Sequence, residues 1–236
     1  MQKKAQLFQK AFKTAFPLTL PIMAGFLFLG FSYGVYMNAS GFSFIYPAIM
    51  SLIIFGGSLE FIAVQMLLSP FAPLQTALMT LMIQARHLFY GISMLDKYSN
   101  TGKMKPYLIF GMCDETFSIN CSAQIPHEVD KGLFMLIVTL LNHSYWFIGS
   151  SLGGLVGSLI SFNTKGIDFV MTAMFVVIFL DNWLKENQHA SSLIGLCSAI
   201  VCLLIFGADS FMIPTMLCIL AALSIFRSPI EGRWQK

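Results

Sequence analysis

The sequence predicts an all-α fold, that of a polytopic helical membrane protein, from its composition and its hydrophobic pattern. Hydrophobic residues make up 56% of the 236 residues and charged residues only 11%, whereas roughly a quarter of a soluble domain is charged. The mean hydropathy is +0.74. A soluble protein of this size could not cover its surface with so few charges. Continuous apolar stretches of about 18 residues or more are typical of transmembrane helices.

The hydrophobic segments follow one another from the first residues to the last. Residues 1–15 form an amphipathic segment, with most lysines on one face and apolar side chains on the other, and we expect it to lie in the cytoplasm. A single transmembrane domain, 16–226, and a cytoplasmic tail, 227–236, complete the expected organisation. The domain contains about seven to eight apolar segments, which cover residues 16–37, 43–68, 73–95, 107–124, 131–160, 167–184, 190–207 and 211–226.

Two of these segments are expected to be broken or re-entrant helices. Lys and Arg gather at the N-terminus, in loop 96–106 and in the tail, and such clusters face the cytoplasm. Three full crossings before residue 96 would put the loop on the far side, so 43–68 should break near 56–58 and return. The same argument predicts a second break near 149–154. The strings at the two sites are similar, as in an internal repeat, and broken helices in corresponding halves indicate a transporter binding site.

Ionisable side chains inside the expected spans point to transport. Each costs roughly 2.5–3.5 kcal/mol at the centre of a span on insertion scales. The formal charges of Glu60, Arg86, Asp114 and Glu115 sum to −2, so the carboxylates should be protonated, hydrated or bound to a cation. This pattern favours a proton-coupled or ion-coupled carrier. The alternative is a structural arginine–carboxylate pair, with the other carboxylates reaching water.

Polar and small residues also share one face of the stretch 131–160. Asn142 and Trp146 lie on a helical stripe with Gly149, Gly153 and Gly157. The stripe suits either a polar path or close helix packing through a double G-x-x-x-G pattern. His87 and His143 are candidate proton carriers, although His143 also suits the role of a hydrogen-bonded bundle histidine.

Several functions are disfavoured. The sequence has no H-E-x-x-H and no Walker motif, and its five cysteines lack metal-ligand spacing. We therefore expect no enzyme activity, no cofactor and no metal. The basic residues are few and spread over loops, so nucleic acid is not an expected partner.

Four strings resemble signatures of the AzlC-type branched-chain amino acid exporter family, the large subunit of a two-component exporter. They run in order along the chain. One departure is Glu60, where the family often has glutamine. The strings are Gly56-Gly57-Ser58-Leu59-Glu60-Phe61, Arg86-His87-Leu88-Phe89-Tyr90-Gly91, Asp114-Glu115-Thr116-Phe117 and Gly166-Ile167-Asp168-Phe169.

The resemblance implies a secondary transporter that exports Leu, Ile and Val, with Met as a further substrate, across the inner membrane and in exchange for protons. It also implies a small hydrophobic AzlD-type membrane subunit as partner. The alternatives are a non-transporting assembly or regulatory membrane subunit and a channel for a small polar solute. The expected substrate-binding residues are Gly57, Ser58, Glu60, Arg86, Asp114, Glu115 and Trp146. The expected proton-coupling residues are Glu60, Asp114, Glu115, His87 and His143.

Overall fold

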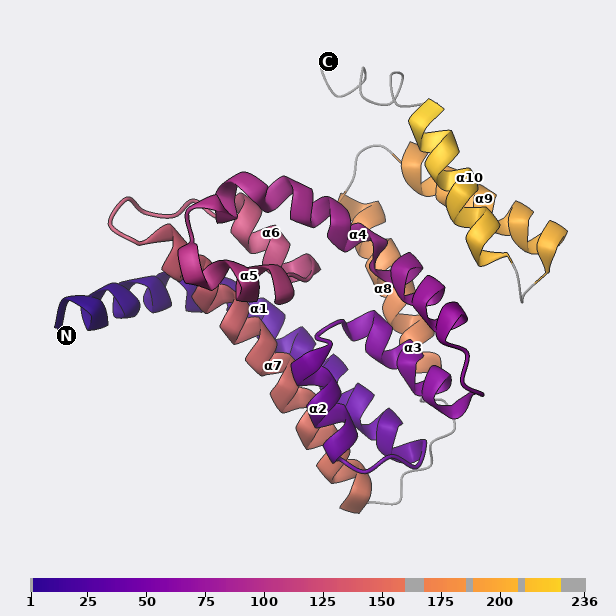
Figure 1. Cartoon of the computed structure of the whole chain (residues 1–236), viewed down its shortest axis with the longest axis horizontal. Coiled ribbons are helices and arrows are strands. Elements are labelled where there is room, and N and C mark those ends of the chain that lie inside the picture. Colours follow the sequence, from indigo (N-terminus) through magenta and orange to yellow (C-terminus); the bar gives the residue numbers. More distant parts are fainter. Residues whose placement is uncertain (1, 160–167, 186–188, 208–210, 226–236) are drawn as a thin grey trace. The chain divides into compact units, whose positions relative to one another are not determined.

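The computed structural model describes residues 2–159, 168–185, 189–207 and 211–225, and every regular element in these ranges is helical (Figure 1). The predicted all-α class is confirmed for these residues. The chain forms two compact units, residues 1–171 and 172–236, which are described separately. The predicted tail, 227–236, lies outside the described residues, and the predicted domain limits stay predictions.

Ten α-helices and one short 3-10 helix make up the described chain. Two of them, α1 and α7, are long and apolar enough to cross a bilayer on their own. The predicted limit at residue 15 falls inside α1, which continues without a break. The elements are α1 (Gln2–Ala39), α2 (Ile45–Ile53), α3 (Gly57–Leu68), α4 (Pro73–Ser99), η1 (Gly102–Met104), α5 (Lys105–Phe110), α6 (Asp114–Ser122), α7 (Lys131–Leu159), α8 (Asp168–Lys185), α9 (Ala190–Phe206) and α10 (Met212–Ile225).

Helices α1 and α7 pack closely and run in the same direction. A Cβ atom added to Gly30 of α1 would lie 3.0 Å from the carbonyl oxygen of Trp146, and one added to Gly149 of α7 would lie 2.8 Å from that of Leu27. Only residues without side chains let two helix backbones approach so closely. The glycine stripe of α7 is therefore the surface that holds α1.

The predicted break near 149–154 is wrong, because α7 is continuous from Lys131 to Leu159. Glycine lowers helix propensity, but it also permits close packing. Here a Cβ atom on Gly153 would lie 2.8 Å from the Cα atom of Phe31 in α1. The packing interpretation of the stripe is the one that the structure supports.

The predicted break near 56–58 is confirmed. It spans three residues, Ile54–Gly56, between the end of α2 and the start of α3. Helices α2 and α3 form a V around it (Figure 1). Phe55 takes a positive φ of 45°, a conformation that costs a bulky residue about 1–3 kcal/mol. Its buried ring is held 4.5 Å from the ring of His143. Packing of this ring offsets the strain and fixes the reversal of the chain.

A second break divides the stretch 107–124, which the sequence analysis had treated as one segment. Helix α5 ends at Phe110 and α6 begins at Asp114. Acidic residues favour the first turn of a helix because of its dipole, and Asp114 and Glu115 lie there. At the other end of α6, Lys97 of α4 donates to the carbonyl oxygen of Cys121 at 2.6 Å. Helix α6 is thus a separate short helix with suitable charges at both ends.

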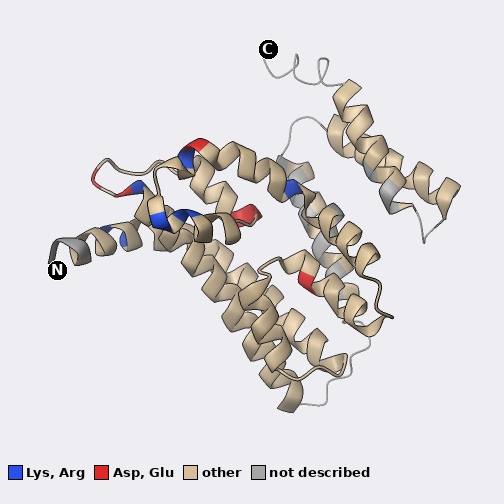
Figure 2. Ribbon diagram, in the orientation of Figure 1, with Lys and Arg blue, Asp and Glu red and all other residues tan. Residues whose placement is uncertain are grey.

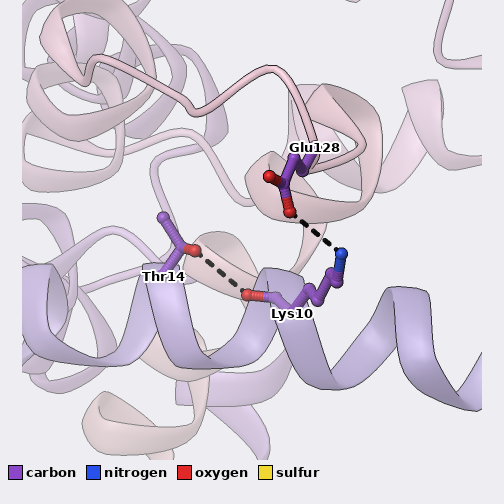
Figure 3. Close-up of polar contacts among 3 residues, drawn as sticks. All are labelled: Lys10, Thr14 and Glu128. Atoms are coloured by element: carbon purple, nitrogen blue, oxygen red, sulfur yellow. Dashed lines mark hydrogen bonds and ion pairs between the residues drawn. The ribbon is translucent and has the colours of Figure 1, made fainter.

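One end of unit 1 collects most of its charges (Figure 2). The N-terminal part of α1, the end of α4, α5 and the start of α7 share a buried cluster there that includes Ala15, Tyr98, Leu108 and Phe134. Lys10 also pairs with Glu128 at 3.1 Å, and the Thr14 hydroxyl donates to the Lys10 carbonyl (Figure 3). This ion pair is exposed and contributes little stability. The lysines of α1 and those of loop 96–106 therefore lie at the same end.

Unit 2 contains a pair of short apolar helices. Helices α9 and α10 lie side by side, and the sulfur atoms of Cys202 and Cys218 are 3.9 Å apart between them. All five cysteines are free thiols.

Candidate binding site

Arg86 joins the starts of two short helices in unit 1. It lies in the middle of α4, and its Nη1 binds the Oδ2 of Asp114, the first residue of α6. Its Nη2 donates to the Oγ of Ser58, in the first turn of α3, at 3.3 Å. The first turn of a helix has free N–H groups and the positive end of the helix dipole. Both helix starts next to Arg86 are therefore suited to an anion.

Glu60 is the fully buried carboxylate of the site, with 0% of its surface exposed. Its Oε1 accepts hydrogen bonds from the backbone N–H of Gly56 at 3.1 Å and from the indole Nε1 of Trp146 at 3.0 Å. Gly57 makes room for the indole, because a Cβ atom there would lie 3.2 Å from the Cη2 of Trp146. Both donors to Glu60 are neutral, so they orient the carboxylate without neutralising its charge.

Asn142 connects α7 to α6. It precedes Trp146 by one turn of α7, and its Nδ2 donates to the Oγ1 of Thr116 at 3.0 Å. Thr116 follows Asp114 by two residues in α6. Hydrogen bonds thus join α4 to α3 and α6, α3 to α7, and α7 to α6, and we call the side chains that make them the polar ring. Its members are Ser58, Glu60, Arg86, Asp114, Thr116, Asn142 and Trp146.

Several buried polar atoms of the ring have no hydrogen-bond partner among the described residues. Three are acceptors, the Oε2 of Glu60, the Oδ1 of Asp114 and the Oδ1 of Asn142, and one is a donor, the Nε of Arg86. More than nine in ten buried polar groups in folded proteins are hydrogen-bonded. The ring can therefore accept a ligand or a proton without breaking its existing hydrogen bonds to neutral donors.

A mostly apolar cavity of about 530 Å³ lies beside the first helix break. Ile54 and Phe55 line it from the break, and Gln84 and His87 line it from α4. The Oε1 of Gln84 and the Nδ1 of His87 also lack partners within the described part of the chain. The remaining lining is largely aliphatic and aromatic, and includes Leu88, Ile92, Leu95, Ile109, Phe110 and Met112. Such a lining suits a branched apolar group.

A second cavity, of about 570 Å³, lies at the charged end of unit 1. Its lining is polar and contains charges of both signs: Asp96 and Lys97 from α4, and Asp130 and Lys131 at the start of α7. The cavity therefore suits water and zwitterionic solutes.

The structure brings most of the predicted site residues together. Gly57 lies beside the ring, and Ser58, Glu60, Arg86, Asp114 and Trp146 belong to it. Glu115 follows Asp114 in the first turn of α6 and is half-buried. Their roles in binding stay predictions, because the geometry gives proximity and hydrogen bonds only.

The two predicted histidines lie outside the ring. His87 lines the apolar cavity. His143 accepts a hydrogen bond from the Tyr107 hydroxyl at 2.8 Å through Nδ1 and donates to the carbonyl oxygen of Ser51 at 3.1 Å through Nε2. Both ring nitrogens of His143 are thus occupied, as in a bundle histidine that fixes neighbouring helices. Its role in proton coupling stays a prediction.

Two ring members, Thr116 and Asn142, were missing from the predicted site residues. Asn142 had been placed on one face with Trp146 by helical spacing, which was the available signal. The partner of its side chain, Thr116, lies 26 residues away in sequence. No local pattern could therefore have connected the two.

One string in α7 fits the G-x-S-x-G pattern of hydrolases, Gly149-Ser150-Ser151-Leu152-Gly153. That motif works at a sharp turn between a strand and a helix. Here the string continues the helix, and the Ser150 hydroxyl donates to the carbonyl oxygen of Trp146 at 2.8 Å. It therefore forms no nucleophile elbow. Within the described ranges, no three or more His, Cys, Asp or Glu side chains gather as a metal site would require.

Comparison with known proteins identifies the family. Residues 21–160 match the family described as AzlC protein. The chain is 57% identical to the branched-chain amino acid transport protein AzlC of Bacillus subtilis, over 98% of this chain and 91% of that protein. It is 50% identical to an uncharacterized membrane protein of Haemophilus influenzae, over 95% and 92% of the two chains. It is 24% identical to the inner membrane protein YgaZ of Escherichia coli, over 92% and 89%. No solved structure matches.

Proposed function

This chain belongs to the AzlC family, and we propose that it is a secondary transporter that exports branched-chain amino acids across the cell membrane in exchange for protons. The chain is a homologue of a branched-chain amino acid transport protein, and other relatives are named membrane proteins. The observation that carries the proposal is Arg86, held between the starts of two short helices with one donor nitrogen unpaired.

Arg86 would bind the carboxylate of the substrate. A guanidinium group presents a planar fork that binds a carboxylate through two parallel hydrogen bonds. In the structure Asp114 occupies part of this fork. The side chains of Arg86 and Asp114 are 37% and 33% exposed, so an incoming carboxylate can reach them. The substrate would then replace Asp114 on Arg86, with the helix start at Ser58 supplying further N–H donors.

The branched side chain of the substrate would enter the apolar cavity. The cavity volume of about 530 Å³ exceeds what one leucine side chain needs, and most of its lining is aliphatic or aromatic. Burial of a leucine side chain contributes about 1.5–3 kcal/mol. An apolar cavity discriminates weakly between residues that differ by one methylene group. One transporter would therefore accept Leu, Ile and Val, and also Met.

Glu60 would carry the coupled proton. Its donors are neutral, and burial of an ionised carboxylate without a cation is costly. The favourable states of such a group are therefore protonated or bound to a cationic ligand. Asp114 would release its bond to Arg86 when substrate binds, which makes it the second candidate.

The N-terminus would face the cytoplasm. The lysines of α1 and loop 96–106 lie at one end of unit 1 (Figure 2), and positive loops face the cytoplasm. In a chain whose five cysteines are replaced by alanine, Asn100→Cys should resist an impermeant thiol reagent added to intact cells. The matched variant Phe71→Cys, in the link between α3 and α4 where Phe71 is 94% exposed, should react. Ready reaction at position 100 with protection at 71 would reverse this orientation.

A small hydrophobic AzlD-type subunit would complete the transporter. The resemblance of the sequence to AzlC-type exporters supports this partner. Helix α4 also exposes Leu78, Leu81 and Phe89, which do not line the apolar cavity, and they form a surface that suits lipid or an apolar helix. Efflux from cells that express the chain alone, compared with co-expression of such a subunit, tests the partner. Equal efflux in both would exclude a required subunit.

Counterflow of labelled leucine into membrane vesicles tests the transport function. Vesicles loaded with unlabelled leucine should accumulate the label through this protein, and the flux should saturate and respond to a proton gradient. A channel would give flux without saturation or counterflow. A regulatory or assembly subunit would give no counterflow even in the presence of the partner subunit. Either result would overturn the proposal.

A further inference from the structure

Two aromatic side chains line the apolar cavity from two different helix breaks. Phe55 lies within the break between α2 and α3, and Phe110 is the last residue of α5, next to the break before α6. Both line the cavity of about 530 Å³. A group that fixes these two rings therefore also fixes two walls of the cavity.

The imidazole of His143, on α7, packs against both rings without lining the cavity itself. Its ring centroid lies 4.5 Å from that of Phe55, at an interplanar angle of 36°, and 5.8 Å from that of Phe110, at 59°. Aromatic rings attract one another at centroid distances of roughly 4.5–7 Å. One buried side chain thus supports a cavity wall from each of the two breaks.

Hydrogen bonds at both nitrogens fix the orientation of this imidazole. The carbonyl oxygen of Ser51 is an acceptor only, so the Nε2 of His143 carries the hydrogen and donates to it. The Nδ1 then accepts from the hydroxyl of Tyr107. Ser51 lies on α2 and Tyr107 on α5, the helices that precede the two breaks. The ring of His143 therefore cannot turn without losing a bond to one of them.

We infer that His143 is a positioning residue for specificity, which acts through Phe55 and Phe110 on the fit between the cavity and the side chain of the substrate. The inference rests on the proposed function. Phe55 has a positive φ of 45°, and such a backbone persists only where its surroundings hold it. Its other aromatic neighbour, Phe26 of α1, is more distant, at 6.5 Å.

Removal of the imidazole would leave a void behind both walls. Side chains around such a void relax into it in part, so Phe55 and Phe110 would move away from the cavity. The cavity would then fit small side chains less closely and accept large ones more readily. The expected consequence is a change in the ranking of substrates by size.

The test compares valine and phenylalanine as competitors of labelled leucine counterflow in vesicles. In His143→Ala, phenylalanine should gain about tenfold or more relative to valine, because a hydrophobic pocket separates substrates by this order for a small difference in size. A purely structural role would lower the flux of all substrates and leave their ranking unchanged. Ser144→Ala is the matched control on α7, since the Ser144 hydroxyl donates to the carbonyl oxygen of Leu140 in the same helix. It should keep the wild-type ranking.

A second variant, Tyr107→Phe, leaves the imidazole in place. It removes the hydroxyl group that the Nδ1 of His143 accepts from and keeps the aromatic ring. The imidazole is then held by one bond instead of two, so the ranking should shift in the same direction but by less. Membrane abundance of every variant is measured in parallel, and Tyr107→Phe decides the matter if His143→Ala fails to insert.

The outcomes separate the inference from the proposed function. Absence of leucine counterflow in wild type, with its partner subunit present, would overturn the proposed function and this inference with it. Counterflow in wild type with an unchanged ranking in the variants would overturn the inference alone. If the ranking is unchanged and counterflow by His143→Ala no longer responds to a pH gradient, His143 acts in proton coupling instead, and the inference is equally wrong.

Discussion

The two interrupted helix pairs of unit 1, α2–α3 and α5–α6, both carry carboxylates after the break but surround them with different partners. Each pair has a three-residue break followed by a helix with carboxylates in its first turn. In α3 the carboxylate is Glu60, fully buried and bound by neutral donors. In α6 it is Asp114, a third exposed and paired with Arg86. The comparison teaches that the same backbone feature can hold a carboxylate in a charge pair or one that is bound by neutral donors alone.

Removal of Arg86 should give the largest effect, because it leaves two carboxylates in the ring without a cation. Arg86→Ala should reduce membrane abundance and abolish leucine efflux. Arg86→Lys keeps the charge but loses the planar fork, so it should insert normally and transport at least about tenfold more slowly. Abundance is measured by immunoblot of membranes and transport by leucine efflux.

Asp114→Asn is the partner control for this prediction. Combined with Arg86→Ala, it removes the carboxylate that Arg86 neutralises and should partly restore abundance without restoring efflux. Glu60→Gln in the same background should restore less, because Glu60 is bound by Gly56 and Trp146 instead. Wild-type efflux by Arg86→Lys would contradict the binding role of Arg86 and leave it as a structural charge.

Loosening α7 should affect both helix pairs, because Trp146 holds Glu60 and Asn142 holds Thr116. Gly153→Leu places a side chain against the backbone of Phe31, and overpacking typically costs about 1–3 kcal/mol. We expect lower abundance and a lower thermal stability of the purified protein. Gly25→Leu on α1 is the control, since a Cβ atom there meets nothing within 4 Å. Equal losses in the two variants would show that α1 and α7 do not depend on this contact.

Glu60→Gln should separate coupling from folding. The amide oxygen of glutamine can still accept from Gly56 and Trp146, so abundance should stay near that of wild type. The proton site is lost, and leucine efflux should no longer respond to an imposed pH gradient. Asp114→Asn, in the other helix pair, should reduce efflux but leave the response to pH. If Asp114→Asn instead loses the response to pH and Glu60→Gln keeps it, Asp114 is the coupled carboxylate and the roles of the two helix pairs are reversed.

The smallest effect is expected at the glycines of the two breaks. A Cβ atom on Gly111 would meet the Cγ2 of the buried Thr139 and lie 3.3 Å from the carbonyl oxygen of Tyr107. One on Gly56 would meet the amide end of Gln84, a flexible side chain. Gly111→Ala should therefore cost about 1 kcal/mol, at the low end for overpacking, and Gly56→Ala less. Thermal unfolding of the purified variants measures the difference, and equal or inverted losses would contradict it.

The residues of the site could be predicted better than their partners. Ionisable groups inside apolar segments are visible in the sequence, and Glu60, Arg86 and Asp114 were found in this way. Their pairing was not, because three carboxylates competed for one arginine, and the choice depends on where α6 starts. The partner of Glu60 is Trp146, 86 residues away, and the partner of Asn142 is Thr116. Such distant contacts leave no local pattern.

The sequence by itself determined the helical membrane class, the end of unit 1 that collects its lysines and the break between α2 and α3. Apolar length and the distribution of charge depend on composition and order alone. Only the tertiary structure decided whether the second predicted break, near 149–154, exists. The strings around Gly57 and Gly149 are similar, but one interrupts a helix and the other lies within one. Glycine permits both outcomes, because it weakens a helix and also allows a close neighbour. The backbone of α1, packed against Gly149 and Gly153, favours the continuous helix α7. The second interruption of unit 1 lies at Gly111–Cys113, between α5 and α6.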